Sequence, residues 1–347
     1  MTIEIHKRVQ HFLLSACLGS RMEALGILVL ERQALLSKRG EEPHPARKKM
    51  RRDADALSQD DALWLSIAEM YKSLNMWDVV RGVVQGKLGA IKEETQKALE
   101  AEATNSHVKA FLLYRQSLDT TDWEEEPLPA ENRLWEEWYS NCAAILGQWS
   151  ELENFVEKRF LQDDAGEVDL NRVWLLPKPT AAALPALVHS KLMNILDGSE
   201  SDGNLIAFID QSMGDHRHRS MLEGDLPLQL GVLAAHQEKF EQANVYANTA
   251  TSMTLLTLSQ YSVLTPNPLL DTLQNVQLLT ELRDCLNNVK YADRDFYSSK
   301  VKQTVTNWKK QKCRIDDNPL MTQCLASYRD LYLHIMEKKL PEDSWRF

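Results

Sequence analysis

The chain has 347 residues, of which 44% are hydrophobic and 26% are charged. A chain of this size and apolar content buries enough surface to fold, so its composition excludes global disorder. Asp and Glu outnumber Lys and Arg by 50 to 40, and this net charge of −10 excludes wholesale binding to a phosphate backbone, which leaves only local or indirect nucleic-acid contact.

Apolar residues recur every three or four positions along most of the chain, so the sequence predicts an all-α fold. Residues 1–39 are expected to form an N-terminal helical hairpin, with helices at 5–18 and 20–38. Ser20 and Glu23 have the spacing of a capping box, in which the two side chains satisfy free amides at the start of the second helix.

Residues 40–57 contain two prolines and no continuous apolar face, which predicts a flexible basic linker. Five cations fall within six positions of this segment: Arg47, Lys48, Lys49, Arg51 and Arg52. Such a tract is typical of a nuclear import signal or a local contact for anions, and it is equally typical of a solvated loop.

From residue 58 to residue 340 the pattern predicts helical hairpins. Each second helix starts with a ring and carries a small or aliphatic residue three positions later. The pairs are Trp77 and Val80, His107 and Ala110, Trp149 and Leu152, and Phe240 and Ala243. We expect Trp77, Ala110, Trp149 and Phe240 to mediate repeat packing, because a ring at the turn and a small residue at the crossing let helices approach closely.

The four helix starts are 30, 42 and 91 residues apart, whereas tetratricopeptide repeats have a period of about 34. We therefore expect an α-solenoid of tetratricopeptide-like hairpins, with insertions at 120–129 and 161–180. Later helices are predicted at 183–197, 203–213, 269–287, 293–310 and 319–339, before a tail at 341–347. The sequence Thr-Pro-Asn-Pro at 265–268 is expected to separate two of them.

The cysteines are odd in number, far apart and never form a Cys-x-x-Cys pair, so the sequence predicts reduced thiols. They are Cys17, Cys142, Cys285, Cys313 and Cys324. Reduced thiols favour the cytosol or the nucleus. No apolar run approaches the ~18 residues that span a bilayer, so we expect no membrane contact.

No catalytic, cofactor or metal site is predicted. Phosphate-binding, dinucleotide-binding, zinc-protease, serine-hydrolase and kinase-loop motifs are all missing from the sequence. His216 and His218 are two positions apart without a third ligand nearby, which disfavours a metal site. Seven of the nine tryptophans lie between Trp64 and Trp174, and the hairpin pattern favours packing over an aromatic cage for a methylated cation.

Five segments resemble the helical FAT region of the DNA-dependent protein kinases, giant enzymes related to phosphatidylinositol 3-kinase. The segments are residues 64–83, 98–123, 169–174, 184–196 and 205–213, which include WLSIAEMYKSLNMWDVVRGV and DLNRVW. The similarity is collinear from about residue 47 to about residue 286, and such long collinear similarity is more specific than any short motif.

This resemblance implies that residues 58–340 form a FAT-type array that clamps the kinase domain of the same polypeptide and transmits conformational change to it. It further implies that an upstream solenoid engages Ku and broken DNA ends, a role in double-strand break repair by non-homologous end joining, and a nuclear location. The resembled span stops before the kinase domain. ATP and Mg are therefore implied for that domain only, and no active-site residue is implied here.

Two other functions stay open. A stand-alone tetratricopeptide-type adaptor would bind peptides in a concave groove lined by polar residues such as Glu69, Lys72 and Asn141. The other is an unrecognised hydrolase, which the missing motifs disfavour.

Four hydroxyl residues precede a glutamine, which kinases of the resembled family favour after their target: Ser58, Thr95, Ser259 and Thr322. Ser58 is the candidate phosphosite, because it lies at an expected helix start beside the basic linker. A phosphate there would meet free amides and nearby Arg51 and Arg52.

Overall fold

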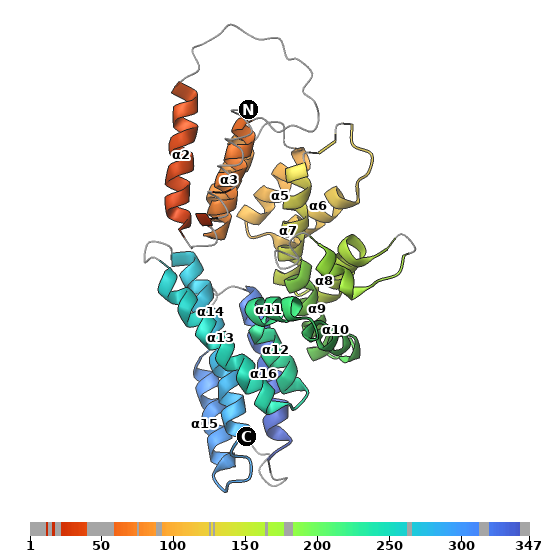
Figure 1. Ribbon diagram of the computed structural model, residues 1–347, viewed down its shortest axis with the longest axis vertical. Helices are drawn as coiled ribbons and strands as arrows, with labels where there is room; N and C mark the ends of the chain where they lie inside the picture. The colour runs from red at the N-terminus through yellow and green to blue at the C-terminus, as the bar shows by residue number, and fades with distance from the viewer. Residues whose placement is uncertain are drawn as a thin grey trace. The chain divides into compact units, whose positions relative to one another are not determined.

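The computed structural model describes residues 22–39, 59–74, 76–87, 92–124, 126–127, 129–163, 166–176, 183–261, 266–311 and 319–340, together with positions 12, 16 and 17. This described part of the chain is built from helices and contains no strand (Figure 1). Within it, extended backbone pairs at one isolated antiparallel bridge, between Gln162 and Val168. The predicted all-α class is therefore confirmed, whereas the solenoid arrangement of its hairpins stays a prediction.

The chain divides into two compact units. The first comprises residues 1–138 and 259–271, and the second comprises residues 139–258 and 272–347. The sequence predicts another division, into a hairpin to residue 39, a linker to 57, an array to 340 and a tail. Nothing in the structure tests that division, so it stays a prediction.

The first unit is a series of helices that pack in chain order. They are α2 (Glu23–Arg39), α3 (Gln59–Ser73), α4 (Trp77–Lys87), α5 (Glu93–Ala103), α6 (His107–Asp119) and the first part of α7 (Pro129–Ile145). α3 packs against both α2 and α4. Ile27 and Leu30 of α2 are buried in one core with Ile67 and Met70 of α3, and this burial holds the two helices together.

α5 and α6 pair around a tight turn in the same unit. Asn105 has a positive φ of 54° there, a conformation that asparagine tolerates better than most residues. Ala110 and Tyr114 are fully buried on the inner face of α6. Tyr114 packs edge-on against Trp138 of α7, with ring centroids 5.8 Å apart, so rings fill the space between these helices.

The second unit continues from the end of α7. Its helices are α8 (Trp149–Val156), the π-helical turn η1 (Glu157–Leu161), the 3-10 helix η2 (Leu170–Leu175), α9 (Ala183–Leu196), α10 (Gly203–Met213), α11 (His216–Asp225), α12 (Pro227–His236), α13 (Phe240–Gln260), α14 (Pro266–Val289), α15 (Tyr297–Lys310) and α16 (Pro319–Glu337). The parts of α13 and α14 within 259–271 belong to the first unit.

Helix α9 lies at the centre of the second unit, in contact with α8, α10, α12 and α16. Its sequence, ALPALVHSKLMNIL, is apolar around most of its circumference. A helix of this kind is stable in water only when neighbouring elements cover it on all sides, which explains its central position.

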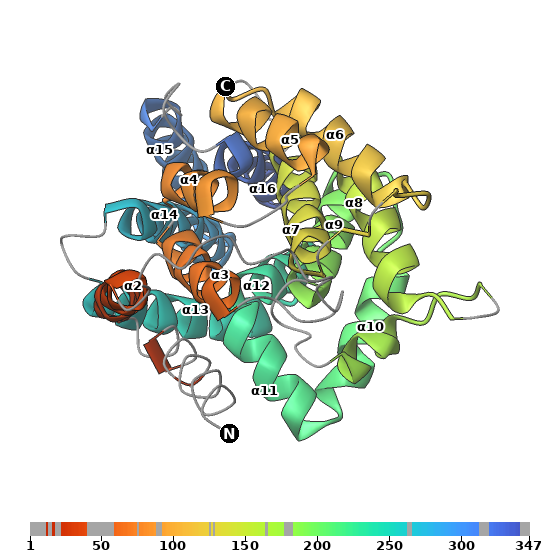
Figure 2. The ribbon, with the colours of Figure 1, turned by 90° about the horizontal axis from the view of Figure 1, so that it is seen from above.

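No helix is predicted from the sequence between residues 214 and 225, but the structure has α11 there, meeting the end of α10 at a corner (Figure 2). Asp215 caps α11, because its carboxylate accepts hydrogen bonds from the backbone amides of Arg217 (2.8 Å) and His218 (3.1 Å). Leu222 is the buried residue of α11, so the helix lacks the apolar stripe on which the prediction depends.

Helix α14 begins at Pro266, inside the segment that is expected to separate two helices. Proline is accepted in a first turn because the first amides of a helix have no partner within it. α13 ends at Gln260, so α13 and α14 are separate elements, but the predicted position of the break is wrong: residues 266–268 belong to α14, which begins three residues before the predicted Leu269.

Four of the cysteines are buried free thiols, namely Cys17, Cys142, Cys285 and Cys324, while Cys313 lies outside the described residues. Among the described helices, none combines the length and apolar character needed to cross a bilayer.

Candidate functional site: the junction of α8 and α9

Rings and a thiol meet where the start of α8 contacts α9 and α16. Trp149, the first residue of α8, is 3% exposed and packs edge-on against His189 of α9, with ring centroids 5.1 Å apart. Nε2 of His189 lies 3.5 Å from Sγ of Cys324 in α16. Three helices therefore share one buried contact.

The turn before α8 is fixed by a glycine. Gly147 has a φ of 66°, in the left-handed region that L side chains rarely adopt. A Cβ atom at this position would also collide with the side-chain amide of Gln323 in α16. Glycine satisfies both conditions without backbone strain and without displacing Gln323, so the turn lies in close contact with α16.

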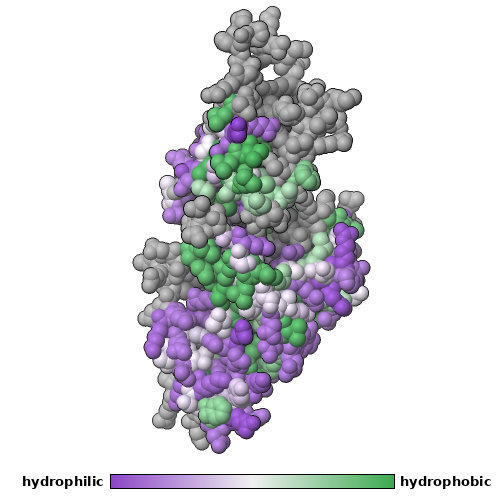
Figure 3. All heavy atoms as spheres, turned by 60° about the vertical axis from the view of Figure 1, so that its left-hand side comes forward, coloured by the Kyte–Doolittle hydropathy of each residue, from purple (hydrophilic) through white to green (hydrophobic). Residues whose placement is uncertain are grey.

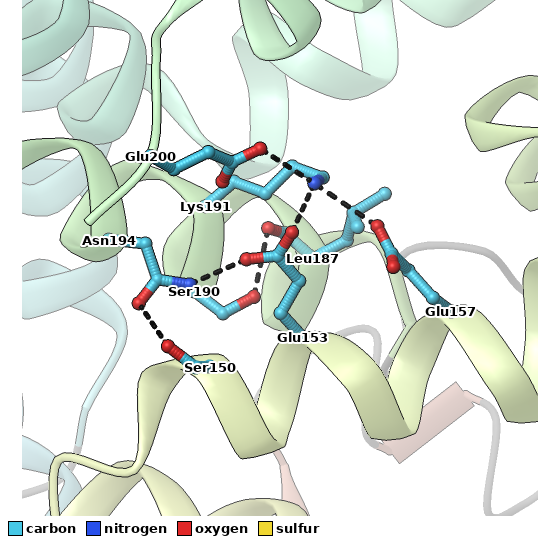
Figure 4. A network of polar contacts seen from close by, with 8 residues as sticks. All are labelled: Ser150, Glu153, Glu157, Leu187, Ser190, Lys191, Asn194 and Glu200. Atoms are coloured by element: carbon cyan, nitrogen blue, oxygen red, sulfur yellow. Dashed lines mark hydrogen bonds and ion pairs between the residues drawn. The ribbon is translucent and has the colours of Figure 1, made fainter. Parts of the chain in front are cut away.

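Lys191 of α9 is the centre of a buried charge network (Figure 4). Its ammonium pairs with Glu153 of α8, with Glu157 at the start of η1 (3.1 Å) and with Glu200 beyond the end of α9 (3.3 Å). The side chain of Lys191 is only 4% exposed. One cation thus joins α8, η1 and the segment that follows α9.

Asn194 extends this network toward the first turn of α8. Its amide donates a hydrogen bond to Glu153 (2.5 Å), and its carbonyl oxygen accepts one from the hydroxyl of Ser150 (3.3 Å). Lys191 and Asn194 are three residues apart on α9, so both face α8. We call the set Ser150, Glu153, Glu157, Lys191, Asn194 and Glu200 the Lys191 network.

Burial and charge act in opposite directions on the ionisable groups of this network. Burial alone lowers the pKa of Lys191, but its hydrogen bonds and ion pairs with Glu153 and Glu157 outweigh this effect and raise the pKa above the ordinary value. Burial raises the pKa of Glu200, and the charge of Lys191 only partly offsets that. Lys191 therefore stays charged, and its single ammonium group pairs with three carboxyl groups.

Cys324 and His189 have the spacing of a nucleophile and its base, but their protonation states are those of a packing contact. Burial raises the pKa of Cys324 to about 12 and lowers the pKa of His189 to about 4. At neutral pH the thiol keeps its proton and the imidazole is neutral. A cysteine nucleophile requires a thiolate, so this pair is not prepared for catalysis.

The described residues offer no group of three or more His, Cys, Asp or Glu side chains arranged to hold a metal ion. His218 instead stacks on Trp174, with ring centroids 4.2 Å apart and planes 11° apart, and Trp174 stacks in turn on Phe208. The buried contacts at the α8–α9 junction hold α8, α9 and α16 in position relative to one another.

The residues predicted to pack the repeats lie at helix starts or on buried faces. α4, α6, α8 and α13 begin at Trp77, His107, Trp149 and Phe240, which confirms the four predicted helix starts. Ala110 and Trp149 are buried, and Phe240 is half-buried with Nζ of Lys339 5.7 Å from its ring centroid. The side chain of Trp77 lies outside the described residues, and a common role in repeat packing stays a prediction.

The basic tract Arg47, Lys48, Lys49, Arg51 and Arg52 and the candidate phosphosite Ser58 lie outside the described residues. Of the other hydroxyl residues followed by glutamine, Thr95 is fully buried: its hydroxyl accepts a hydrogen bond from the Trp135 indole (2.8 Å) and donates one to Glu131. A kinase cannot reach Thr95 in the folded chain. Ser259 is exposed, and Thr322 is half-buried.

The polar residues expected to line a peptide groove differ in their surroundings. Glu69 and Asn141 are exposed, whereas Lys72 forms an ion pair with Glu137 of α7. Burial lowers the pKa of Lys72, and the charge of Glu69 opposes this. The adaptor function stays a prediction.

The sequence patterns do not predict the Lys191 network. Two signals in the sequence point toward it. Lys191 and Asn194 interrupt an otherwise apolar run, and Glu153 and Glu157 are four residues apart on one helix face. Their pairing requires contacts between segments 38 residues apart, which periodicity does not reveal.

No family model matches the chain. It is 33% identical over 274 residues, 79% of its length, to the DNA-dependent protein kinase catalytic subunit of Gallus gallus. It is 32% identical over 299 residues to that of Xenopus laevis and 27% identical over 334 residues to that of Canis lupus familiaris, which are 86% and 94% of this chain. The chain spans 6 to 8% of the length of these relatives.

Proposed function

Because this chain resembles a segment of the DNA-dependent protein kinase catalytic subunit, we propose that it is a non-catalytic helical scaffold, of the FAT type, within a protein kinase of that kind. The similarity covers 79 to 94% of the chain, and this is the observation that carries the proposal. In this role the tetratricopeptide-like hairpins support the kinase domain of the same polypeptide.

The scaffold transmits conformational change to the kinase domain. In stacked hairpins each element contacts mainly its neighbours, so small rotations add up over the array. Coupling of this kind typically corresponds to about 1 to 3 kcal/mol between two arrangements. Support comes from α9, whose contacts with α8, α10, α12 and α16 and whose Lys191 network make the second unit resist local deformation.

The proposal extends to the partners and location that the resemblance implies. Ku and DNA ends are engaged indirectly, through the whole enzyme, in double-strand break repair by non-homologous end joining in the nucleus. ATP and Mg bind the kinase domain and not this segment.

A phosphoryl-transfer assay tests the proposal. The purified chain is incubated with ATP, Mg and a Ser-Gln peptide, and the Gallus gallus relative is assayed in parallel as the positive control. We expect turnover by the relative and none by the chain. Turnover that survives repeated purification of the chain would overturn the non-catalytic role.

Calorimetric titration of the chain with candidate C-terminal peptides distinguishes the peptide-binding adaptor from the kinase scaffold. A kinase scaffold requires no such ligand. If a peptide binds saturably and Glu69→Lys abolishes that binding, the chain is an adaptor and the scaffold proposal is wrong.

A further inference from the structure

Helix α2 has apolar residues on two opposite faces. One face, with Ile27, Leu30 and Ala34, is buried against α3. The opposite face carries Leu25, Leu28, Val29 and Leu35, which are 50, 65, 44 and 67% exposed. Figure 3, which brings this side of the molecule forward, shows hydrophobic residues gathered on the surface there.

Three exposed leucines of α2 lie in one line with Arg32. Leu25, Leu28, Arg32 and Leu35 are separated by three, four and three residues, which is the spacing of the core positions of a coiled coil. We call these four positions the α2 stripe. A helix that is apolar on both sides is favoured in water only when both sides are covered, so the stripe indicates a neighbour that is not among the residues the structure describes.

Arg32 interrupts the stripe at its centre with a positive charge. The residue is exposed and has no carboxylate partner among the residues that the structure describes. The neighbouring Glu31 accepts a hydrogen bond from the Tyr71 hydroxyl (2.8 Å), and Glu23 is buried. A neighbour that covers the stripe must therefore supply a carboxylate opposite Arg32, since an unpaired charge is costly to bury.

A second copy of the chain does not meet this requirement. In a parallel pairing of two stripes Arg32 faces Arg32, which places like charges together. In the antiparallel pairing that superimposes the stripes, Leu25 faces Leu35 and Arg32 faces Leu28. Both arrangements leave the guanidinium without an acid.

We propose that the α2 stripe docks an amphipathic helix of another polypeptide, with aliphatic residues at heptad spacing and one Asp or Glu facing Arg32. The 17 residues of α2 span about 25 Å, so a partner helix of the same length contains two to three heptads. The aliphatic side chains provide the buried area, and the charge pair sets the register. This inference does not depend on the proposed kinase scaffold.

Two synthetic helices of about 21 residues, with Leu at the core positions, serve as probes. They differ at the single core position opposite Arg32, which is Glu in one and Lys in the other. Fluorescence anisotropy measures the dissociation constant of each with the full chain. We expect the Glu peptide to bind at least about tenfold more tightly, and Arg32→Glu to reverse this preference.

Leu28→Asp places a charge on the stripe and should abolish binding. Its matched control is Leu112→Asp on α6, at a leucine that is 56% exposed and outside the stripe, and this variant should bind normally. Thermal melts confirm that both variants fold.

Absence of binding by either peptide would overturn the proposal. So would equal binding of both peptides that Arg32→Glu leaves unchanged. Sedimentation of the chain alone tests for self-association. A dimer that Leu28→Asp dissociates would show that a second copy covers the stripe, and this result would also overturn the proposal.

Discussion

Trp149 of α8, His189 of α9 and Cys324 of α16 form one shared contact in the second unit. The indole is 3% exposed, and the imidazole lies against it at 5.1 Å and against Cys324 at 3.5 Å. Because the three groups belong to different helices, each contributes to the free energy of unfolding by burying another. Substitutions here measure how tightly α8, α9 and α16 are packed.

Trp149→Ala should lower the free energy of unfolding by about 3 to 5 kcal/mol, because it removes a buried indole and leaves a cavity. Urea denaturation followed by circular dichroism measures the change. Trp149→Phe keeps a ring against His189 and should lower the free energy of unfolding by less than Trp149→Ala does. Equal stability of the alanine variant and the wild type would show that the indole is not part of a core.

His189 makes the stability of the second unit depend on pH. Burial lowers its pKa from 6.5 to about 4, so the unfolded chain binds a proton that the folded chain excludes. The stabilisation is complete above the unfolded pKa and is lost as pH falls from 6.5 toward 4. The loss amounts to about 3 kcal/mol.

His189→Phe keeps an aromatic ring beside Trp149 but cannot titrate. Denaturation of both proteins at neutral pH and near pH 4 should show the wild type losing about 3 kcal/mol more than the variant. Parallel pH dependences of the two proteins would mean that His189 is protonated while folded.

At the scale of elements, α8 and α9 are joined by charges and the α7–α8 turn is joined to α16 by close contact. The Lys191 network uses one face of each helix, with residues spaced by three or four positions. Gly147 at the turn lies against Gln323. Pairings of this kind specify which helices are neighbours as well as stabilising them.

Lys191→Met should destabilise the chain by about 3 to 5 kcal/mol, since it leaves buried carboxylates without their cation. Adding Glu153→Gln to this variant should recover part of the loss, because the two residues act as a pair. Chemical denaturation of the two single variants and the double variant measures the coupling. Strictly additive effects would show that the ion pair contributes nothing specific.

Gly147→Ala should cost about 1 to 2 kcal/mol for the left-handed backbone alone, plus the displacement of Gln323. Gln323→Ala removes the obstructing side chain but not the backbone strain. The double variant should therefore be more stable than the sum of the two single effects predicts. Full recovery to wild-type stability would mean that the backbone at residue 147 is unstrained.

The four helix starts could be predicted because each combines a ring with a small or aliphatic residue three positions later. Trp149 and Phe240 show this pattern as local sequence, without reference to distant residues. The helix α11 could not, because it buries Leu222 alone and begins with charged residues. The Lys191 network could not either, since Glu153 and Lys191 are brought together only by the packing of α8 on α9.

At the scale of the whole molecule, the chain consists of two compact units, each with its own buried residues. The second unit is organised around α9, and the first presents the uncovered α2 stripe. Both features suit a protein whose surfaces are used by other chains or other parts of a larger chain. In the function proposed above, the segment acts through its packing and contributes no catalytic group.

The most direct measurement is DNA-stimulated phosphoryl transfer by a chimera, in which this chain replaces the matched segment of the Gallus gallus relative. We predict that the chimera retains DNA-stimulated activity and that Lys191→Met in it reduces the stimulation while ATP affinity is unchanged. A chimera that folds but shows the same DNA stimulation with and without Lys191→Met would contradict the proposed transmission of conformational change through this segment.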